Sequence, residues 1–123
     1  MTVATRLLYV CNQGANRSRE AADQVARVGA TRGWAIETRT AGIYSEETPL
    51  TPGLMAWGDI VFLFQEDHLA LLQERYPRDM FRMRCVLIPI PDVYDYGSDI
   101  LKDLLEKALK KDWLDFLDDV VAS

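Results

Sequence analysis

The sequence predicts an α/β fold with three layers, in which helices flank a four-stranded parallel sheet. Four short apolar runs are too brief for helices, and stretches with apolar residues at helical spacing follow them. This alternation of strands and helices predicts parallel pairing with helices on both faces of the sheet. The 123 residues, of which 49% are hydrophobic and 27% charged, are typical of a globular chain. We therefore expect a single domain over residues 1–123 with its own core.

The four predicted strands are bounded in different ways. RLLYVC, residues 6–11, is a short apolar run with polar flanks, and AIETRT, residues 35–40, alternates apolar and polar residues. DIVFLF, residues 59–64, is almost continuously apolar, which is typical of a strand covered on both faces. CVLIPI, residues 85–90, contains Pro89, which favours a sheet edge or a strand end because proline donates no ladder hydrogen bond.

The predicted helices follow each strand in turn. Residues 18–31 carry apolar side chains near helical spacing, and Gly33 is a suitable stop. A short helix is expected over residues 51–57 after a Thr-Pro pair, and another over residues 66–76. Ser98 can cap a final helix whose apolar stripe continues to the C-terminus, with a bend expected near Lys110 and Lys111.

Composition excludes several classes of function. The net charge of −5 argues against a broad nucleic-acid-binding face, and no apolar stretch reaches the length of a membrane span. Two cysteines and one histidine are too few for a disulfide framework or a cysteine-based zinc site. We expect no metal and no cofactor, a reduced cytoplasmic compartment without a signal peptide, and a monomer or weak dimer.

The segment CNQGANRS, residues 11–18, joins the first predicted strand to the first predicted helix. Successive N–H groups of a tight loop before a helix form a nest that binds anions, and Gly14 can take the positive φ that such a curl needs. Arg17 can hold two phosphate oxygens with its planar fork. The same positive surroundings favour a thiolate at Cys11, to which Ser18 can donate a hydrogen bond. The predicted phosphate ligands are Asn12, Gln13, Gly14, Ala15, Asn16, Arg17 and Ser18.

The Cys-x5-Arg-Ser pattern resembles the phosphate loop of protein tyrosine phosphatases. Its place after the first strand of a short α/β chain resembles the low-molecular-weight branch of that group. The resemblance implies a phosphatase that hydrolyses phosphotyrosine, or a similar aryl phosphate, on a protein or a small molecule through a cysteinyl-phosphate intermediate. It also implies that Cys11 is the nucleophile, Arg17 the phosphate clamp and Ser18 the partner of the thiolate.

The general acid is expected after the fourth strand, on the same edge of the sheet as Cys11. Asp92 lies there, in a stretch that resembles the Ile-Pro-Asp-x-Tyr element of a group of short predicted tyrosine phosphatases, and we favour it over Asp95. Tyr94 resembles the aromatic residues with which the family stacks on an aromatic leaving group. Tyr96 and Tyr44 are further candidates for the walls of the cleft.

The chain also departs from the family pattern. Gly14 replaces a bracing asparagine, a role that can pass to Asn12 or Asn16, and Arg19 replaces a proline. "NRSREA" resembles the phosphatase that acts on the RNA polymerase II tail. The segment of residues 43–58 is short, which predicts an open side to the cleft. Two alternatives therefore stay open: a phosphoserine phosphatase acting on a protein tail, and an oxyanion-binding regulatory module with little turnover.

Two remaining side chains have simpler interpretations. Cys85 begins the fourth predicted strand and is expected to be buried, with a Cys11–Cys85 disulfide as the less favoured alternative. His68 lies on a predicted helix without a ligand partner and is expected to be a surface or capping residue.

Overall fold

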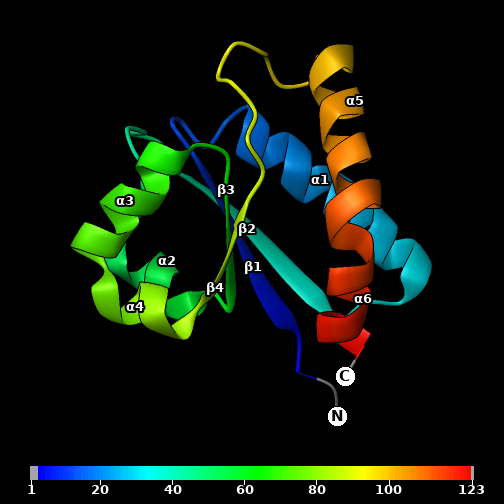
Figure 1. The fold of residues 1–123 in the computed structure, drawn as a ribbon, viewed down its shortest axis with the longest axis horizontal. Helices are drawn as coiled ribbons and strands as arrows, with labels where there is room; N and C mark the ends of the chain where they lie inside the picture. The colour runs from blue at the N-terminus through cyan, green and yellow to red at the C-terminus, as the bar shows by residue number, and fades with distance from the viewer. Residues whose placement is uncertain (1–2, 123) are drawn as a thin grey trace.

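A four-stranded parallel sheet forms the centre of the molecule, as predicted. The computed structural model describes residues 3–122. The strands are in the order β2-β1-β3-β4, and each pairs in parallel with its neighbours (Figure 1). Their bounds are β1 Thr5–Cys11, β2 Ile36–Gly42, β3 Ile60–Leu63 and β4 Arg84–Leu87.

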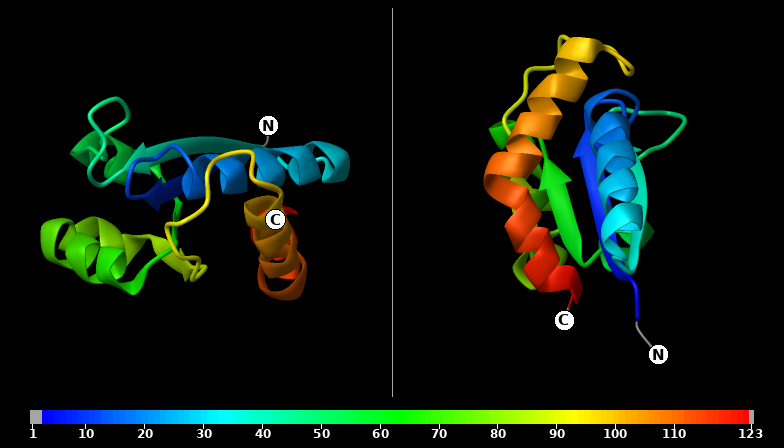
Figure 2. Two further views of the ribbon diagram at one scale, coloured as in Figure 1. Left: turned by 90° about the horizontal axis from the view of Figure 1, so that it is seen from above. Right: turned by 90° about the vertical axis from the view of Figure 1, so that its right-hand side faces the viewer.

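Helices cover both faces of this sheet. The first face carries α1, α5, η1 and α6, and the second carries α2, α3 and α4 (Figures 1 and 2). The helices are α1 Arg17–Arg32, α2 Pro52–Trp57, α3 Glu66–Arg75, α4 Pro77–Arg82, α5 Asp99–Ala108, the π-helix η1 Leu109–Trp113 and α6 Leu114–Ala122. None of the helices within residues 3–122 is long and apolar enough to cross a lipid bilayer.

Capping residues set the predicted ends of three helices. The Thr51 hydroxyl accepts a hydrogen bond from the N–H of Leu54 at 3.1 Å, and the Ser98 hydroxyl accepts one from the N–H of Leu101 at 3.4 Å. Gly33 ends α1 in the left-handed conformation, with φ of 73°.

Two local differences from the predicted elements have simple causes. Pro77 ends α3 but also starts α4, because a proline fits the first turn of a helix, where its missing N–H has no intrahelical acceptor. The edge strand β4 ends at Leu87, before Pro89. The predicted bend near Lys110 coincides with the π-helix between α5 and α6.

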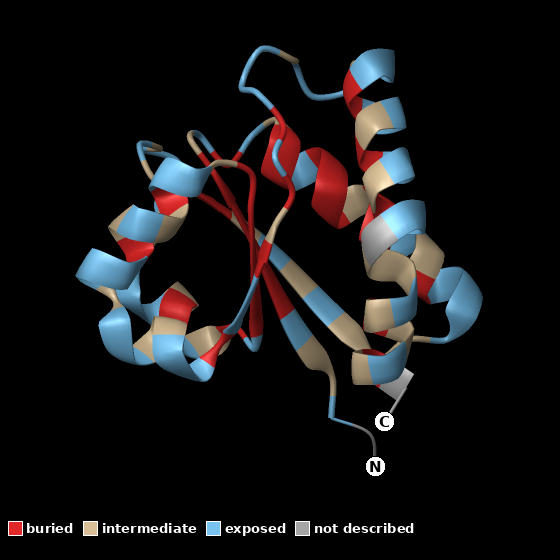
Figure 3. Cartoon of the chain, viewed as in Figure 1, coloured by how far each residue is buried: buried red, intermediate tan, exposed pale blue. Residues whose placement is uncertain are grey.

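The core is divided by the sheet into two apolar layers. Along β1, Leu7, Tyr9 and Cys11 face the layer under α1 and α5, whereas Leu8 and Val10 face the layer under α2 and α3. All five are buried, and Figure 3 shows the buried colour concentrated in the sheet and in the helix faces turned toward it. This alternation places the Cys11 side chain on the α1 side of the sheet, at the carboxyl end of β1.

The strand order reverses at β1, which pairs with β2 on one side and with β3 on the other. In open parallel sheets, ligands bind at the carboxyl ends of strands beside such a reversal. Cys11 ends β1, Gln65 follows β3 and Asp92 follows β4, so all three lie toward this edge.

Candidate active site

The loop between β1 and α1 surrounds the sulfur of Cys11 with hydrogen-bonding groups. Cys11 is the last residue of β1, and α1 begins six residues later at Arg17. The N–H of Gly14 donates to Cys11 Sγ at 3.2 Å, and the Ser18 Oγ lies 3.2 Å from the same sulfur. Two donors aimed at one sulfur are the arrangement that stabilises a thiolate, so the geometry suits a nucleophilic cysteine.

Two glycines allow this loop to lie directly against the end of β2. Gly14 has a φ of 70°, and a Cβ on it would lie 2.7 Å from the carbonyl carbon of Ala41. A Cβ on Gly42 would lie 2.3 Å from the carbonyl carbon of Gln13. Both distances are shorter than the non-bonded contacts that Cβ atoms make in proteins, so the curl of the loop requires glycine at both positions.

Replacing Gly14 with alanine is expected to cost more stability than the same change at Gly33. Both glycines have a left-handed φ, which costs alanine about 1 kcal/mol, but a Cβ on Gly33 meets no atom within 4 Å. Gly14→Ala adds overlap with the backbone of β2, so we expect it to lower the free energy of unfolding by roughly 3 kcal/mol. Urea denaturation of both variants measures the difference. Equal losses would mean that the loop can move off β2 without cost.

Arg17 is fully buried at the start of α1 and ties the strand ends together. Its Nη1 donates to the carbonyl of Ile90 at 2.6 Å, and its Nη2 donates to Gln65 Oε1. Burial lowers the pKa of Arg17, while the charges of Asp92 and Cys11 oppose this shift. The guanidinium stays charged, because arginine is not deprotonated in proteins. Its Nε–H is buried and has no partner within residues 3–122. A buried donor of this kind costs about 1–3 kcal/mol until an acceptor such as an oxyanion reaches it.

Asp92 lies beside this guanidinium, as expected for the candidate acid. Its Oδ2 is 3.7 Å from Arg17 Nη2, and its side chain is 36% exposed, so it is accessible from solvent. Asp95 is exposed three residues farther on, and within the described part of the chain its side chain forms no hydrogen bond or ion pair with the loop. The structure therefore places Asp92, but not Asp95, against the loop.

Two polar residues that the sequence did not single out for the site complete this network. Gln65 lies two residues after the end of β3 and accepts from Arg17 and, at 3.2 Å, from Asn12 Nδ2. The prediction for His68 is wrong, because its side chain is fully buried and its Nε2 lies 2.8 Å from Asn12 Oδ1. Burial lowers the pKa of His68, and the nearby Arg17 adds to that effect, whereas Asp67 and Asp92 oppose it.

The remaining predicted ligands lie outside this hydrogen-bond network. Gln13 and Ala15 are exposed and line a hollow of about 490 Å³ with four residues after β2, namely Tyr44, Ser45, Glu46 and Glu47. Asn16 Oδ1 accepts a hydrogen bond from the N–H of Tyr96 at 3.1 Å, which ties the loop to the segment before α5. Tyr94 is half-buried and packs against the core under α1 and α5.

Cys85 is exposed on the edge strand β4, so the prediction that it is buried is wrong. Both Cys11 and Cys85 are free thiols, so the structure contains no disulfide between them. An edge strand has a neighbour on one side only, which leaves Cys85 at the margin of the sheet.

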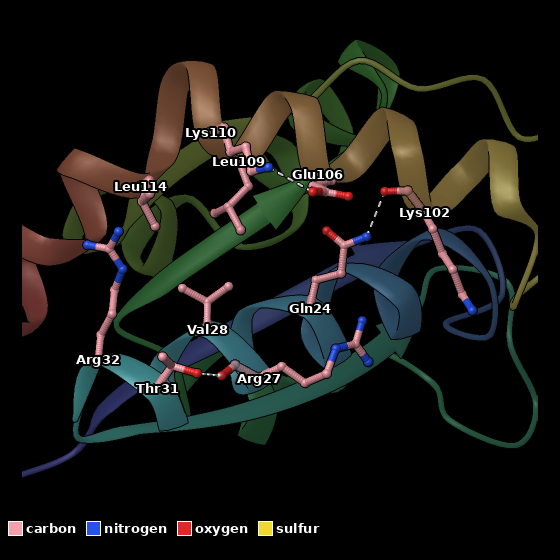
Figure 4. A pocket seen from close by; sticks show the side chains of 10 residues that line it. All are labelled: Gln24, Arg27, Val28, Thr31, Arg32, Lys102, Glu106, Leu109, Lys110 and Leu114. Carbon is pink, nitrogen blue, oxygen red and sulfur yellow. Dashed lines mark hydrogen bonds and ion pairs between the residues drawn. The ribbon is translucent and has the colours of Figure 1, made fainter.

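A second hollow, of about 460 Å³, lies between α1 and the C-terminal helices (Figure 4). It shares no lining residue with the loop at Cys11. Two of its cations are already paired: Lys110 with Glu106 at 2.8 Å, and Arg32 with Asp118. Since it is separate from the nucleophile and its charges are partly neutralised, it is not part of the candidate active site.

The fold of this chain matches solved structures of small phosphatases. A low-molecular-weight protein tyrosine phosphatase from T. tengcongensis aligns with a TM-score of 0.75 at 17% identity, over 94% of this chain and 99% of that chain. The tyrosine phosphatase Wzb from Escherichia coli K30, in complex with phosphate, aligns with a TM-score of 0.73 at 19% identity over the same shares. The chain has the low-molecular-weight protein tyrosine phosphatase fold.

This phosphatase fold is not restricted to tyrosine phosphatases. The YwlE arginine phosphatase from Geobacillus stearothermophilus aligns with a TM-score of 0.61 at 18% identity, over 93% of this chain and 96% of that chain. No protein-family model and no curated protein matches the sequence. The predicted fold is thus confirmed, while the roles of Cys11, Arg17 and Asp92 stay predictions.

Proposed function

We propose that this protein is a cysteine-dependent phosphatase that hydrolyses phosphotyrosine, or a similar aryl phosphate, through a cysteinyl-phosphate intermediate. The observation that carries the proposal is the convergence of Cys11, Ser18 and the unpartnered Nε–H of Arg17 beside one loop. A nucleophile, a donor for its thiolate and a buried cation with a free donor are what phosphoryl transfer to sulfur requires.

In the first step, the thiolate of Cys11 attacks phosphorus as the bond from phosphorus to the aryl oxygen breaks. Arg17 and the N–H groups of the loop stabilise the charge on the three equatorial oxygens. Asp92, in its protonated form, donates its proton to the departing oxygen, so that the alcohol leaves neutral.

In the second step, the Asp92 carboxylate removes a proton from water, which attacks the phosphorus of the cysteinyl phosphate. The sulfur–phosphorus bond breaks, inorganic phosphate leaves, and the Cys11 thiolate and protonated Asp92 are restored. The Ser18 hydroxyl, 3.2 Å from the sulfur, stabilises the thiolate as leaving group.

Aromatic residues near the site support an aryl substrate. Tyr94 follows Asp92 by two residues, and Tyr44 is 62% exposed on the wall of the hollow beside Gln13 and Ala15. An exposed aromatic ring beside a phosphate site can stack on an aromatic leaving group.

Phosphoarginine is the second candidate substrate. Glu46 and Glu47 line the same hollow, and carboxylates there would attract the cationic guanidinium that carries the phosphoryl group. The match to the Geobacillus stearothermophilus arginine phosphatase is consistent with this candidate.

A peptide panel tests the proposal. We expect kcat/KM to be highest for a phosphotyrosine peptide when phosphotyrosine, phosphoserine and phosphoarginine are compared in one sequence. A preference for phosphoarginine or phosphoserine would replace the proposed substrate by that alternative. Phosphate binding without turnover of any peptide would indicate the oxyanion-binding module instead.

Asp92→Asn is expected to lower kcat for an aryl phosphate by about 10²- to 10³-fold, because the amide cannot donate or accept the transferred proton. Asp95→Asn is the matched control, and we expect it to change kcat less than about twofold, as for a surface side chain without site contacts. Steady-state kinetics with both variants measure the two effects. The reverse order would assign the acid role to Asp95.

A further inference from the structure

A chain of side-chain hydrogen bonds leads from the buried His68 to the candidate acid. His68 Nε2 lies 2.8 Å from Asn12 Oδ1, and Asn12 Nδ2 donates to Asp92 Oδ2 at 2.6 Å. The three residues come from α3, from the loop after β1 and from the segment after β4. Asn12 thus lies between a buried, fixed ring and a partly exposed carboxylate.

The chemistry of the three groups fixes the direction of every hydrogen bond. An ionised carboxylate only accepts, so the NH₂ end of Asn12 faces Asp92 and its carbonyl oxygen faces His68. The carbonyl also only accepts, so His68 must carry a proton on Nε2. Its Nδ1 is buried without a partner within residues 3–122, and an unprotonated Nδ1 avoids an orphaned donor there. The lowered pKa of His68 agrees with this neutral form, in which burial and Arg17 outweigh Asp67 and Asp92.

The Asn12 side chain has no donor left for a phosphate oxygen. One amide hydrogen faces Asp92, the other faces Gln65 Oε1 at 3.2 Å, and the carbonyl accepts from His68. Contact between Asn12 and phosphate is therefore left to its backbone N–H, and its side chain serves another purpose.

We propose that Asn12 is a positioning residue for the general acid Asp92, and that His68 fixes the orientation of the Asn12 amide. This inference rests on the proposed function. Asn12 donates to Oδ2, and Arg17 Nη2 lies 3.7 Å from the same oxygen, so Oδ2 is the acceptor atom of the protonated carboxyl. Oδ1 is then the atom that carries the proton and gives it to the leaving oxygen.

His68 is needed because the side-chain amide of an asparagine can otherwise flip by rotation, which exchanges its oxygen and its nitrogen. When Asp92 is protonated, its O–H could bond the Asn12 carbonyl if the amide were reversed. A fixed Nε2–H on His68 opposes that reversal, because two donors would then face each other. The buried histidine thereby keeps Oδ1 as the atom that gives the proton in the first step and takes it in the second.

Asn12→Leu tests the role of the amide with aryl phosphates of graded leaving-group quality. We expect kcat to fall about tenfold for a poor leaving group such as phenol and much less for p-nitrophenol, which needs less protonation. A variant that merely loosened the phosphate loop would lose activity equally on both. Asn12→Ser carries the same test if the leucine variant does not fold.

A double-mutant cycle shows whether Asn12 acts through Asp92. In an Asp92→Asn background, Asn12→Leu should have no further effect on kcat, since the group it positions is gone. Multiplicative losses in the double variant would overturn the inference. Wild-type protein that turns over no phosphomonoester would overturn the proposed function and the inference with it, so the two failures are distinguishable.

Substitutions at His68 complete the test. His68→Leu should reproduce the leaving-group dependence of Asn12→Leu. His68→Gln should keep most of the wild-type kcat, because its amide N–H can replace Nε2–H. Equal losses in His68→Leu and His68→Gln on every leaving group would assign His68 to packing alone and overturn its part in the proposal.

Discussion

Cys11→Ser is expected to reduce turnover of an aryl phosphate by at least about 10⁴-fold, the scale on which removal of a catalytic nucleophile acts. A serine hydroxyl is a far weaker acid than a thiol, and within residues 3–122 the groups hydrogen-bonded to Cys11 Sγ include no base to deprotonate it. The two donors at this position, the Gly14 N–H and the Ser18 hydroxyl, stabilise an anion and do not remove a proton.

The same variant should keep its fold and its affinity for inorganic phosphate within severalfold. In the proposed mechanism Arg17 and the loop N–H groups bind the oxyanion, and Cys11→Ser leaves them in place. Cys85→Ser is the matched control, because this second free thiol is exposed on β4, and we expect it to have wild-type kcat. Initial rates and phosphate titration by calorimetry measure both quantities. Turnover of the aryl phosphate by Cys11→Ser at a rate near that of the wild type would contradict the proposed mechanism.

The carboxyl edge of the sheet explains why two candidate site positions can be located from so little sequence. Eighty residues lie between Cys11 and Asp92, yet Cys11 ends one strand of the parallel sheet and Asp92 comes after another, and the carboxyl ends of parallel strands lie at one edge. The apolar runs locate the strands, and the strands locate the edge. In the structure, Asp92 Oδ2 lies 3.7 Å from Arg17 Nη2.

The position of a residue just after a strand also indicates Gln65, which lies two residues beyond β3, once amides are counted among the candidate site residues. His68 is harder to find. It lies in the first turn of α3, and one histidine among polar neighbours has no periodic pattern that distinguishes an inward from an outward face. Its ring nitrogen contacts Asn12, and no local pattern encodes a contact between residues 56 positions apart.

The exposure of Cys85 also depends on packing that the local sequence does not encode. Its run of apolar neighbours predicts a strand correctly, but the sequence does not say which residues of an edge strand are covered. That depends on which residues the neighbouring helices cover, and this is a matter of tertiary packing.

Arg17→Lys is expected to lower kcat/KM by about 10³-fold, or about 4 kcal/mol of transition-state stabilisation, although the charge is kept. The guanidinium reaches the Ile90 carbonyl and Gln65 with Nη1 and Nη2 and still has Nε–H free. An ammonium is a point charge without a planar fork, so it cannot hold both strand ends and two phosphate oxygens at once.

Arg19→Lys is the control, because Arg19 is exposed and stacks on Tyr96 at 4.2 Å, outside the loop, so its loss should be less than about twofold. Steady-state kinetics and urea denaturation separate the two parts of the Arg17 effect. If Arg17→Lys loses stability but keeps more than a tenth of the wild-type kcat/KM, Arg17 serves mainly to join the ends of β3 and β4 to the loop. The N–H nest would then carry the phosphate alone. A large kinetic loss with little change in stability would mean instead that the fork acts on the phosphate itself, which is the result that the unpartnered Nε–H leads us to expect.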